Sequence, residues 1–161
     1  MLMRIIVVSD THGDYETLYD IVARNLSADQ FIHLGDGEGE FCDIQSEFYD
    51  KPFIYIKGNC DWEAHPQSLV TELGGHKFYL CHGHRFEQTR LKEDLAATAS
   101  VNGCDVALFG HTHVPCSEDL NGVLLFNPGS TSRPRGGSAP SYGVITIAGD
   151  GTLSAAHIRL K

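Results

Sequence analysis

Five short motifs in the chain place side chains that can bind metal ions next to glycines. They are Asp10-Thr11-His12-Gly13, Gly35-Asp36-Gly37, Gly58-Asn59-Cys60-Asp61, Cys81-His82-Gly83-His84 and Gly110-His111-Thr112-His113. Each follows an apolar segment that is typical of a buried strand. Carboxylate and imidazole ligands suit Mn, Fe, Zn or Ni better than Ca or Mg. Seven ligands of this kind are too many for one tetrahedral site and about right for two ions that share one carboxylate.

The loops that carry these motifs are expected to meet. In α/β sheets, ligands bind beyond the carboxyl ends of the strands, so motifs that each follow a strand can converge on one site. Glycine permits tight backbone paths there that a Cβ atom would block. The side chains expected to converge there are Asp, His and Asn.

Taken singly, most of the motifs also have a purely structural explanation. An Asp-x-His after a strand occurs by chance, Gly35-Asp36 is a common kind of turn, and asparagine tolerates the positive φ of some turns. The two His-x-His pairs are harder to explain, because two imidazoles at this spacing after a buried strand rarely serve packing. The order and strand context of all five motifs favour metal binding.

The pattern of apolar residues predicts the elements that position these loops. In the first half, strand-like segments at residues 4–9, 31–34 and 53–57 alternate with helical ones, which predicts a parallel sheet with crossover helices. In the second half, a hairpin at 68–81 and a helix at 87–101 precede five short strands, near residues 105–109, 114–117, 123–126, 142–148 and 153–160. We expect an α/β (α+β) fold of two face-to-face sheets with helices outside, forming a single domain over residues 1–161.

Composition restricts the partners and the compartment. Twelve Lys and Arg against 21 Asp and Glu give a formal net charge of −9, which argues against generic nucleic-acid binding because such binding depends on basic side chains. Bound metal ions could still attract a phosphate-containing substrate. No apolar run approaches the length of a membrane span, and the pattern before Asp10 is not that of a signal peptide. The five cysteines form no C-x-x-C pair, as in a reduced cytosolic protein. We expect a cytoplasmic protein without membrane contact, and a homo-oligomer is left open.

The ordered set D-x-H-G, G-D, G-N, H-G-H and G-H-T-H resembles the calcineurin-like metallophosphoesterase superfamily. The chain length and the G-N-C-D, H-G-H and Asn127-Pro128-Gly129-Ser130 forms resemble its small bacterial and archaeal phosphodiesterase branch. This resemblance implies a four-layer fold with two mixed sheets flanked by helices. It also implies a dinuclear phosphoric ester hydrolase, of the phosphodiesterase type (EC 3.1.4), that acts on a small phosphate ester.

The resemblance also implies a role for each ligand. One divalent ion, expected to be Mn²⁺ with Ni²⁺, Fe²⁺ or Zn²⁺ as alternatives, would be held by Asp10, His12 and His113. The second would be held by Asn59, His82 and His111, and Asp36 would bridge the two. A hydroxide between the ions would attack phosphorus in line.

One position departs from the superfamily pattern. Many members have histidine directly after the G-N asparagine, where it assists the leaving group, and this chain has Cys60 there. A thiol is a poorer proton donor than imidazolium and carries no positive charge near neutral pH. His84 and Asp61 are therefore alternative groups on the leaving-group side. Arg133 and Arg135, in the Pro/Gly-rich loop, are candidates for binding the substrate phosphate.

Two other functions are possible on the same fold. The eukaryotic retromer subunit resembling this branch is an interaction scaffold and has lost part of the metal set, whereas all seven ligand positions are filled here. Some superfamily members are DNA-repair nucleases, but the charge of −9 argues against that function.

Overall fold

Two five-stranded β-sheets form the centre of the molecule in the computed structural model, which describes residues 2–161. Sheet A has the strand order β10-β9-β1-β2-β3 and sheet B the order β4-β5-β6-β8-β7. The strands of sheet A are Met3–Val8 (β1), Gln30–His33 (β2), Phe53–Tyr55 (β3), Ser141–Ile147 (β9) and Leu153–Arg159 (β10). Those of sheet B are Ser68–Leu73 (β4), His76–Cys81 (β5), Val106–Leu108 (β6), Cys116–Leu120 (β7) and Val123–Asn127 (β8).

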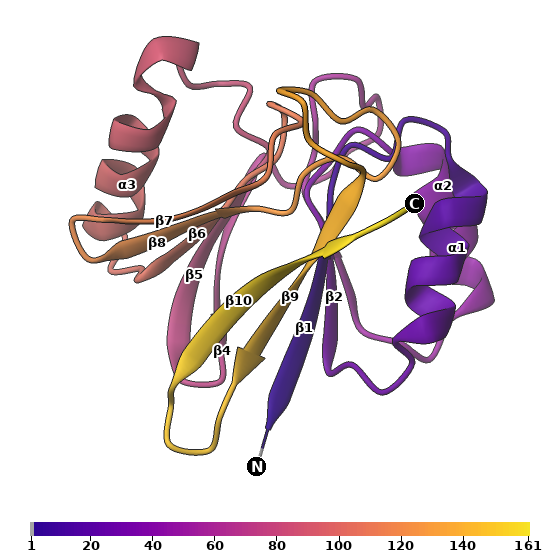
Figure 1. The fold of residues 1–161 in the computed structure, drawn as a ribbon, viewed down its shortest axis with the longest axis horizontal. Helices are drawn as coiled ribbons and strands as arrows, with labels where there is room; N and C mark the ends of the chain where they lie inside the picture. Colours follow the sequence, from indigo (N-terminus) through magenta and orange to yellow (C-terminus); the bar gives the residue numbers. More distant parts are fainter. Residues whose placement is uncertain (1) are drawn as a thin grey trace.

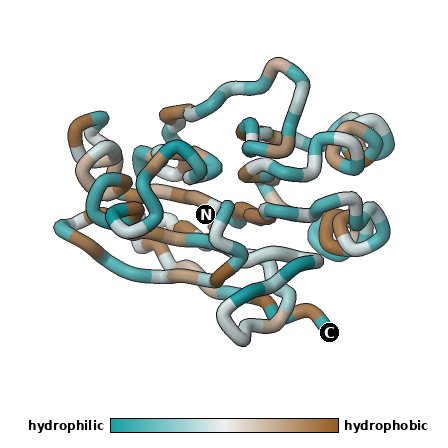
Figure 2. The backbone as a smooth tube through the Cα atoms, turned by 90° about the horizontal axis from the view of Figure 1, so that it is seen from above, coloured by the Kyte–Doolittle hydropathy of each residue, from teal (hydrophilic) through white to brown (hydrophobic). Residues whose placement is uncertain are grey.

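The helices cover the outer faces of the two sheets. Figure 1 shows α1 (Tyr15–Arg24) and α2 (Glu38–Glu47) on the side of sheet A, and α3 (Leu91–Val101) on the side of sheet B. A 3₁₀ turn, η1 (Gln88–Arg90), leads into α3. In Figure 2 brown and teal alternate along the helical coils, as expected for helices with one buried face. The layers are therefore helices, sheet, sheet and helix, and the predicted α/β fold with two face-to-face mixed sheets is confirmed.

The parallel part of each sheet explains where the loops gather. In sheet A, β1 pairs in parallel with β2, and β2 with β3. In sheet B, β6 pairs in parallel with β5 and β8. The carboxyl ends of parallel strands lie at one edge of a sheet, and Figure 1 shows the loops that leave them at the upper end of both sheets.

One strand boundary differs from the sequence prediction. The strand expected near residues 114–117 begins at Cys116 and extends to Leu120. Proline cannot donate a backbone hydrogen bond to a neighbouring strand, so Pro115 is poorly suited to the paired segment. Asn121-Gly122 forms the turn that closes this strand on β8, where Leu120 pairs with Val123.

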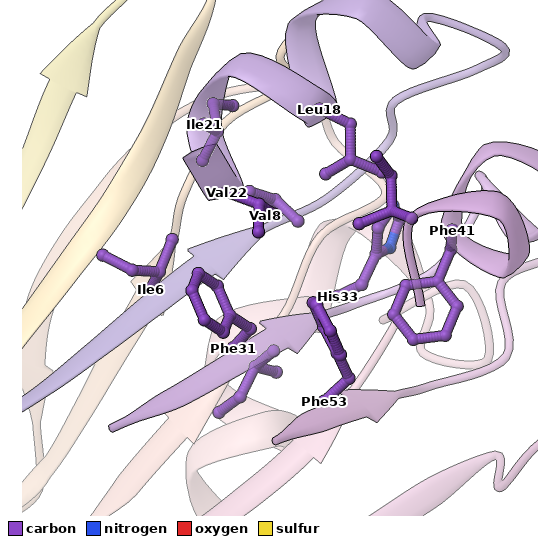
Figure 3. A pocket seen from close by; sticks show the side chains of 11 residues that line it. Ile6, Val8, Leu18, Ile21, Val22, Phe31, His33, Phe41 and Phe53 are labelled. Atoms are coloured by element: carbon purple, nitrogen blue, oxygen red, sulfur yellow. The ribbon is translucent and has the colours of Figure 1, made fainter. Parts of the chain in front are cut away.

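Three apolar clusters hold the layers together. The central cluster lies between the sheets and includes Val7, Ile32, Leu80 and Phe126, all fully buried. A second packs α3 on sheet B, and a third packs α1 and α2 on sheet A. Within the third cluster is a cavity of about 10 Å³ with an almost entirely apolar lining (Figure 3). It has room for about one water molecule, so it is part of the core rather than a substrate site.

Among residues 2–161, the structure contains no helix with the length and apolar character needed to cross a membrane.

The two sheets approach each other closely at Gly143 of β9. A Cβ atom at this position would lie 2.4 Å from Cε2 of Phe126, whose ring is fully buried and stacks on His157. Gly143→Ala should therefore lower the free energy of unfolding by about 1–3 kcal/mol, because neither sheet can move without disturbing the core. Denaturant unfolding measures the change. Gly39→Ala is the control, since a Cβ there meets nothing within 4 Å; it should leave stability unchanged or raise it by up to about 1 kcal/mol. Equal effects of the two substitutions would contradict the close approach.

Candidate metal centre

The loops after five strands bring all seven predicted ligands to one end of the molecule. Asp10 and His12 follow β1, Asp36 follows β2, and Asn59 follows β3. His82 follows β5, and the loop after β6 carries His111 and His113. Backbone hydrogen bonds join neighbouring loops: Asp10 N–H donates to Gly35 O, His12 N–H to Asp36 O, and Gly110 N–H to His82 O.

The backbone at these residues is unusual. Asp10, His12, Asp36, His111 and His113 all have positive φ, between 43° and 67°. Among the non-glycine residues at positions 2–161, only Asn121 shares this conformation. A left-handed conformation costs a residue with a Cβ atom roughly 1–2 kcal/mol, and it persists where the surrounding structure enforces it, often at functional sites.

Asp10, His12 and His113 form one group of potential ligands, with ligand atoms all within 4.8 Å of one another. Asp10 Oδ1 lies 3.1 Å from His113 Nε2 and 3.6 Å from His12 Nε2. The two imidazole Nε2 atoms are 3.3 Å apart. These are the three residues expected to share one ion.

A second group contains Asp10, Asp36 and His82. His82 Nε2 lies 3.2 Å from Asp36 Oδ2 and 3.7 Å from Asp10 Oδ1. Asp36 Oδ2 is also 3.8 Å from His12 Nε2, so this carboxylate lies between ligands of the two predicted sets. The other two members of the second set, Asn59 and His111, contact each other, with Asn59 Oδ1 3.1 Å from His111 Nδ1.

Backbone carbonyl groups orient two of the imidazoles. His82 Nδ1 lies 2.6 Å from Leu34 O, and His113 Nδ1 lies 2.6 Å from Arg133 O. Because a carbonyl oxygen only accepts, each Nδ1 carries the hydrogen and donates it. In the neutral ring the Nε2 lone pair then faces the carboxylates, as in histidines that bind metal ions.

The facing ligand atoms fit divalent cations. Asp10 Oδ1 and His82 Nε2 are buried and have no hydrogen-bond partner among residues 2–161. Leaving a buried polar atom unpaired costs about 1–3 kcal/mol. Divalent cations between carboxylate oxygens and imidazole nitrogens would satisfy these atoms, and the donor set of oxygen and nitrogen suits transition metals.

The neighbouring imidazoles affect the pKa values of the two buried carboxylates. Burial by itself would raise the pKa of Asp10, but the adjacent imidazoles of His113 and His12 outweigh burial and lower it. For Asp36, burial again opposes ionisation, but the contact with His82 lowers the pKa below its usual value. Both carboxylates are therefore ionised at neutral pH and available as ligands.

Glu40, on the first turn of α2, holds the loop that carries Asp10 and His12. Its Oε2 accepts hydrogen bonds from Gly13 N–H at 2.5 Å and from the Thr11 hydroxyl at 2.7 Å. The Thr11 hydroxyl in turn lies 3.0 Å from Nε2 of His33, whose Nδ1 accepts from Gly35 N–H. His33 is buried and has a structural role in this network. Glu40 cannot be recognised as a supporting residue from the sequence, because an acidic residue at the start of a helix is common for helix stability alone.

Asp61 holds two other loops together. Its Oδ2 accepts hydrogen bonds from Gly58 N–H at 2.7 Å, from the Tyr55 hydroxyl at 2.8 Å and from Asp36 N–H at 3.1 Å. The loops lie so close that a Cβ on Gly58 would be 2.1 Å from Asp36 Oδ1. These contacts give Asp61 a positioning role that sequence reasoning did not anticipate.

The other two candidates for the leaving-group side lie next to the ligands. Cys60 is exposed, and its Sγ is within 4.8 Å of ligand atoms of His12 and Asp36. The His84 ring centroid is 5.4 Å from that of His82 and 6.2 Å from that of His111. Burial, together with the nearby His82 and His111, lowers the pKa of His84.

The Ser/Arg-rich loop covers the first ligand group. Hydroxyl groups of Ser130 and Ser132 donate to the backbone oxygens of Asp10 and Thr11. The backbone oxygen of Arg133 accepts a hydrogen bond from His113 Nδ1, and the backbone N–H of Arg135 donates to His113 O at 3.0 Å. Both arginine side chains are exposed, so their guanidinium groups are available to solutes at this end of the molecule.

Comparisons with known proteins agree with this arrangement. Residues 3–150 match the family model described as the calcineurin-like phosphoesterase superfamily domain. The chain is 35% identical over 150 residues to "Probable metallophosphoesterase YsnB" of Bacillus subtilis. The matched region covers 92% of this chain and 86% of the relative. It is 29% identical over 170 residues to phosphodiesterase YfcE of Escherichia coli K12, covering 89% of this chain and 88% of that protein.

A solved structure gives the same result for the fold. The crystal structure of a predicted phosphoesterase from Streptococcus pneumoniae has a TM-score of 0.80 and 28% identity, with 99% of each chain covered. The matched family model spans nearly the whole chain, and its members use divalent metals, for which the loops supply candidate ligands. The chain belongs to the calcineurin-like phosphoesterase superfamily and is a phosphoesterase of the hydrolase class.

Proposed function

We propose that this protein is a phosphodiesterase that uses two divalent metal ions. The observation that carries the proposal is the convergence of Asp10, Asp36, His82 and His113, whose carboxylate oxygens and Nε2 atoms approach within 3.1–3.7 Å. The buried Asp10 Oδ1 and His82 Nε2 have no hydrogen-bond partner among the described residues, and a cation is the simplest group that would satisfy both.

The ligand groups suggest how two ions would be held. Asp10, His12 and His113 would bind one, and His82, Asn59 and His111 the other. Asp36 would bridge the two ions, because its Oδ2 lies near both His82 and His12. When bound, the ions would lower the pKa of a water between them, so that hydroxide attacks phosphorus, and would stabilise charge on the phosphoryl oxygens. Mn²⁺ is the ion we expect.

The remaining side chains would act on the substrate. The exposed guanidinium groups of Arg133 and Arg135 can donate paired hydrogen bonds to a phosphate. His84 and Cys60 lie beside the ligands, where a leaving group would depart. Asp61 would hold the bridging residue in place, since it binds the backbone of Asp36. We treat residues 1–161 as one domain, because the central core draws on strands from β1 to β10.

The two alternative functions are less well supported. A scaffold that does not use metal has no need of five ligand residues in left-handed backbone conformations. A nuclease would have to bind a polyanion with a net charge of −9. A small phosphodiester is therefore the substrate class that we propose.

The first prediction concerns the number of ions. Protein reconstituted with Mn²⁺ should hold two ions per chain, and Asp36→Asn should lose metal and activity together, because an amide is a poor bridging ligand. Elemental analysis of dialysed protein measures the content. Asp119→Asn, on the edge strand β7 where the side chain is exposed, is the control and should retain both ions. No more than one tightly bound ion in the parent at saturation would rule out the dinuclear site.

The second prediction concerns the reaction. Bis(4-nitrophenyl) phosphate should be hydrolysed faster than 4-nitrophenyl phosphate, which has the same leaving group. A monoester carries an additional negative charge, and Cys60 supplies no positive charge where many superfamily members have histidine. Initial rates of nitrophenolate release, measured over a range of substrate concentrations, give kcat/KM for both. Faster monoester turnover across several matched leaving groups would overturn the preference.

The third prediction concerns Cys60. If leaving-group protonation limits the rate, Cys60→His should accelerate hydrolysis of esters with poor leaving groups by about 10-fold or more, while activated aryl esters change little. General acid catalysis typically contributes about 10²–10⁴-fold. The dependence of kcat on leaving-group pKa is the measurement, with metal content determined in parallel because the larger ring could displace Asn59. Cys42→His, at an exposed position on α2, is the control. An unchanged dependence in a variant that keeps both ions would show that protonation at this position is not limiting.

A further inference from the structure

A hollow lies beside the metal centre, at the end of β5. It has a volume of about 240 Å³, and its lining includes His82, His84, Tyr79, Arg85 and Phe86. Pockets for whole ligands commonly enclose about 300–1000 Å³. This hollow therefore suits one part of a ligand whose remainder lies elsewhere.

His84 connects the hollow with the metal ligands. It lines the hollow, and its ring centroid is 5.4 Å from that of His82 and 6.2 Å from that of His111. The hollow therefore adjoins the ligand groups, within reach of an ester substituent on a phosphate held by them.

Tyr79 and Phe86 make the hollow suitable for a ring. Both pack against the apolar cluster beneath α3, but each remains partly exposed. Helix α3 packs mainly on β6, β7 and β8, so β5 keeps part of its outer face open. Aromatic side chains bind other rings through stacked or edge-to-face contacts.

Arg85 adds a positive charge at the opening. Its side chain is exposed and belongs to the lining of the hollow. A guanidinium group can stack on an aromatic ring and can attract an anionic substrate in a protein whose net charge is −9.

We infer that this hollow is a subsite for an aromatic ester substituent of the substrate, either an aryl group or a nucleobase-containing group. The inference rests on the proposed function, because the phosphate must be held by the metal centre for the substituent to reach the hollow. It narrows the substrate class from small phosphodiesters to diesters with at least one aromatic substituent.

The experiment compares phenylphosphonate with methylphosphonate, which share the anionic group and differ in the ring. Calorimetric titration of the full, Mn²⁺-reconstituted chain should show phenylphosphonate binding about 10-fold more tightly. Phe86→Leu, which keeps an apolar side chain but removes the ring, should reduce this ratio to about twofold or less without changing methylphosphonate affinity. Trp62→Ala is the matched control: this aromatic residue is 89% exposed and lies outside the hollow, so the ratio should persist.

Several results would contradict the inference. Equal affinities in the parent, a ratio that survives Phe86→Leu, or a ratio that Trp62→Ala abolishes would remove the subsite and leave the proposed function intact. Failure of both phosphonates to bind the Mn²⁺-loaded parent would contradict the proposed function and the subsite with it. NMR of the parent loaded with diamagnetic Zn²⁺ provides a test that does not depend on the folding of a variant: phenylphosphonate, but not methylphosphonate, should shift the ring signals of Phe86 and Tyr79.

Discussion

Two buried carboxylates face imidazole nitrogens at the end of both sheets, and much of the structure holds them there. Asp10 and Asp36 approach Nε2 atoms of His113 and His82 at 3.1 and 3.2 Å. The Nδ1 hydrogens of both rings are committed to backbone carbonyls, so lone pairs face one another across the centre. Positive charge between these groups stabilises the arrangement, which is the physical basis for proposing a metal site there.

The fold meets this requirement with rigid strands and strained loops. Parallel strands from both sheets direct their loops to one place, and five ligand residues adopt left-handed backbone conformations there. Two carboxylates outside the predicted ligand sets compensate for the strain, because each accepts two or three hydrogen bonds from these loops and their neighbours. Glu40 fixes the loop of Asp10 and His12, and Asp61 fixes the loops of Asp36 and Gly58. The ligands are therefore held by contacts from helix α2 and strand β3 as well as by their own loops.

The sequence was sufficient to predict the architecture and the convergence of the ligand loops. The periodicity of apolar residues indicated the alternation of strands and helices, and each ligand motif directly follows a strand. The sequence could not indicate that the carboxylates of Glu40 and Asp61 hold the ligand loops. Glu40 looks like any acidic residue in the first turn of a helix, and the three donors to Asp61 come together only when β2 and β3 pair. The hollow beside His84 depends on which strands α3 covers, and that packing is not encoded in a local pattern.

The dependence of stability on Mn²⁺ tests the central claim most directly. A folded state that binds two ions absent from the unfolded chain gains stability with each tenfold increase in ion concentration above the dissociation constants. The account predicts that the free energy of unfolding, measured by denaturant titration in buffered Mn²⁺, rises by about 2.7 kcal/mol per tenfold increase. A slope of about 1.4 kcal/mol would indicate a single ion, and no dependence on Mn²⁺ would contradict the metal centre itself.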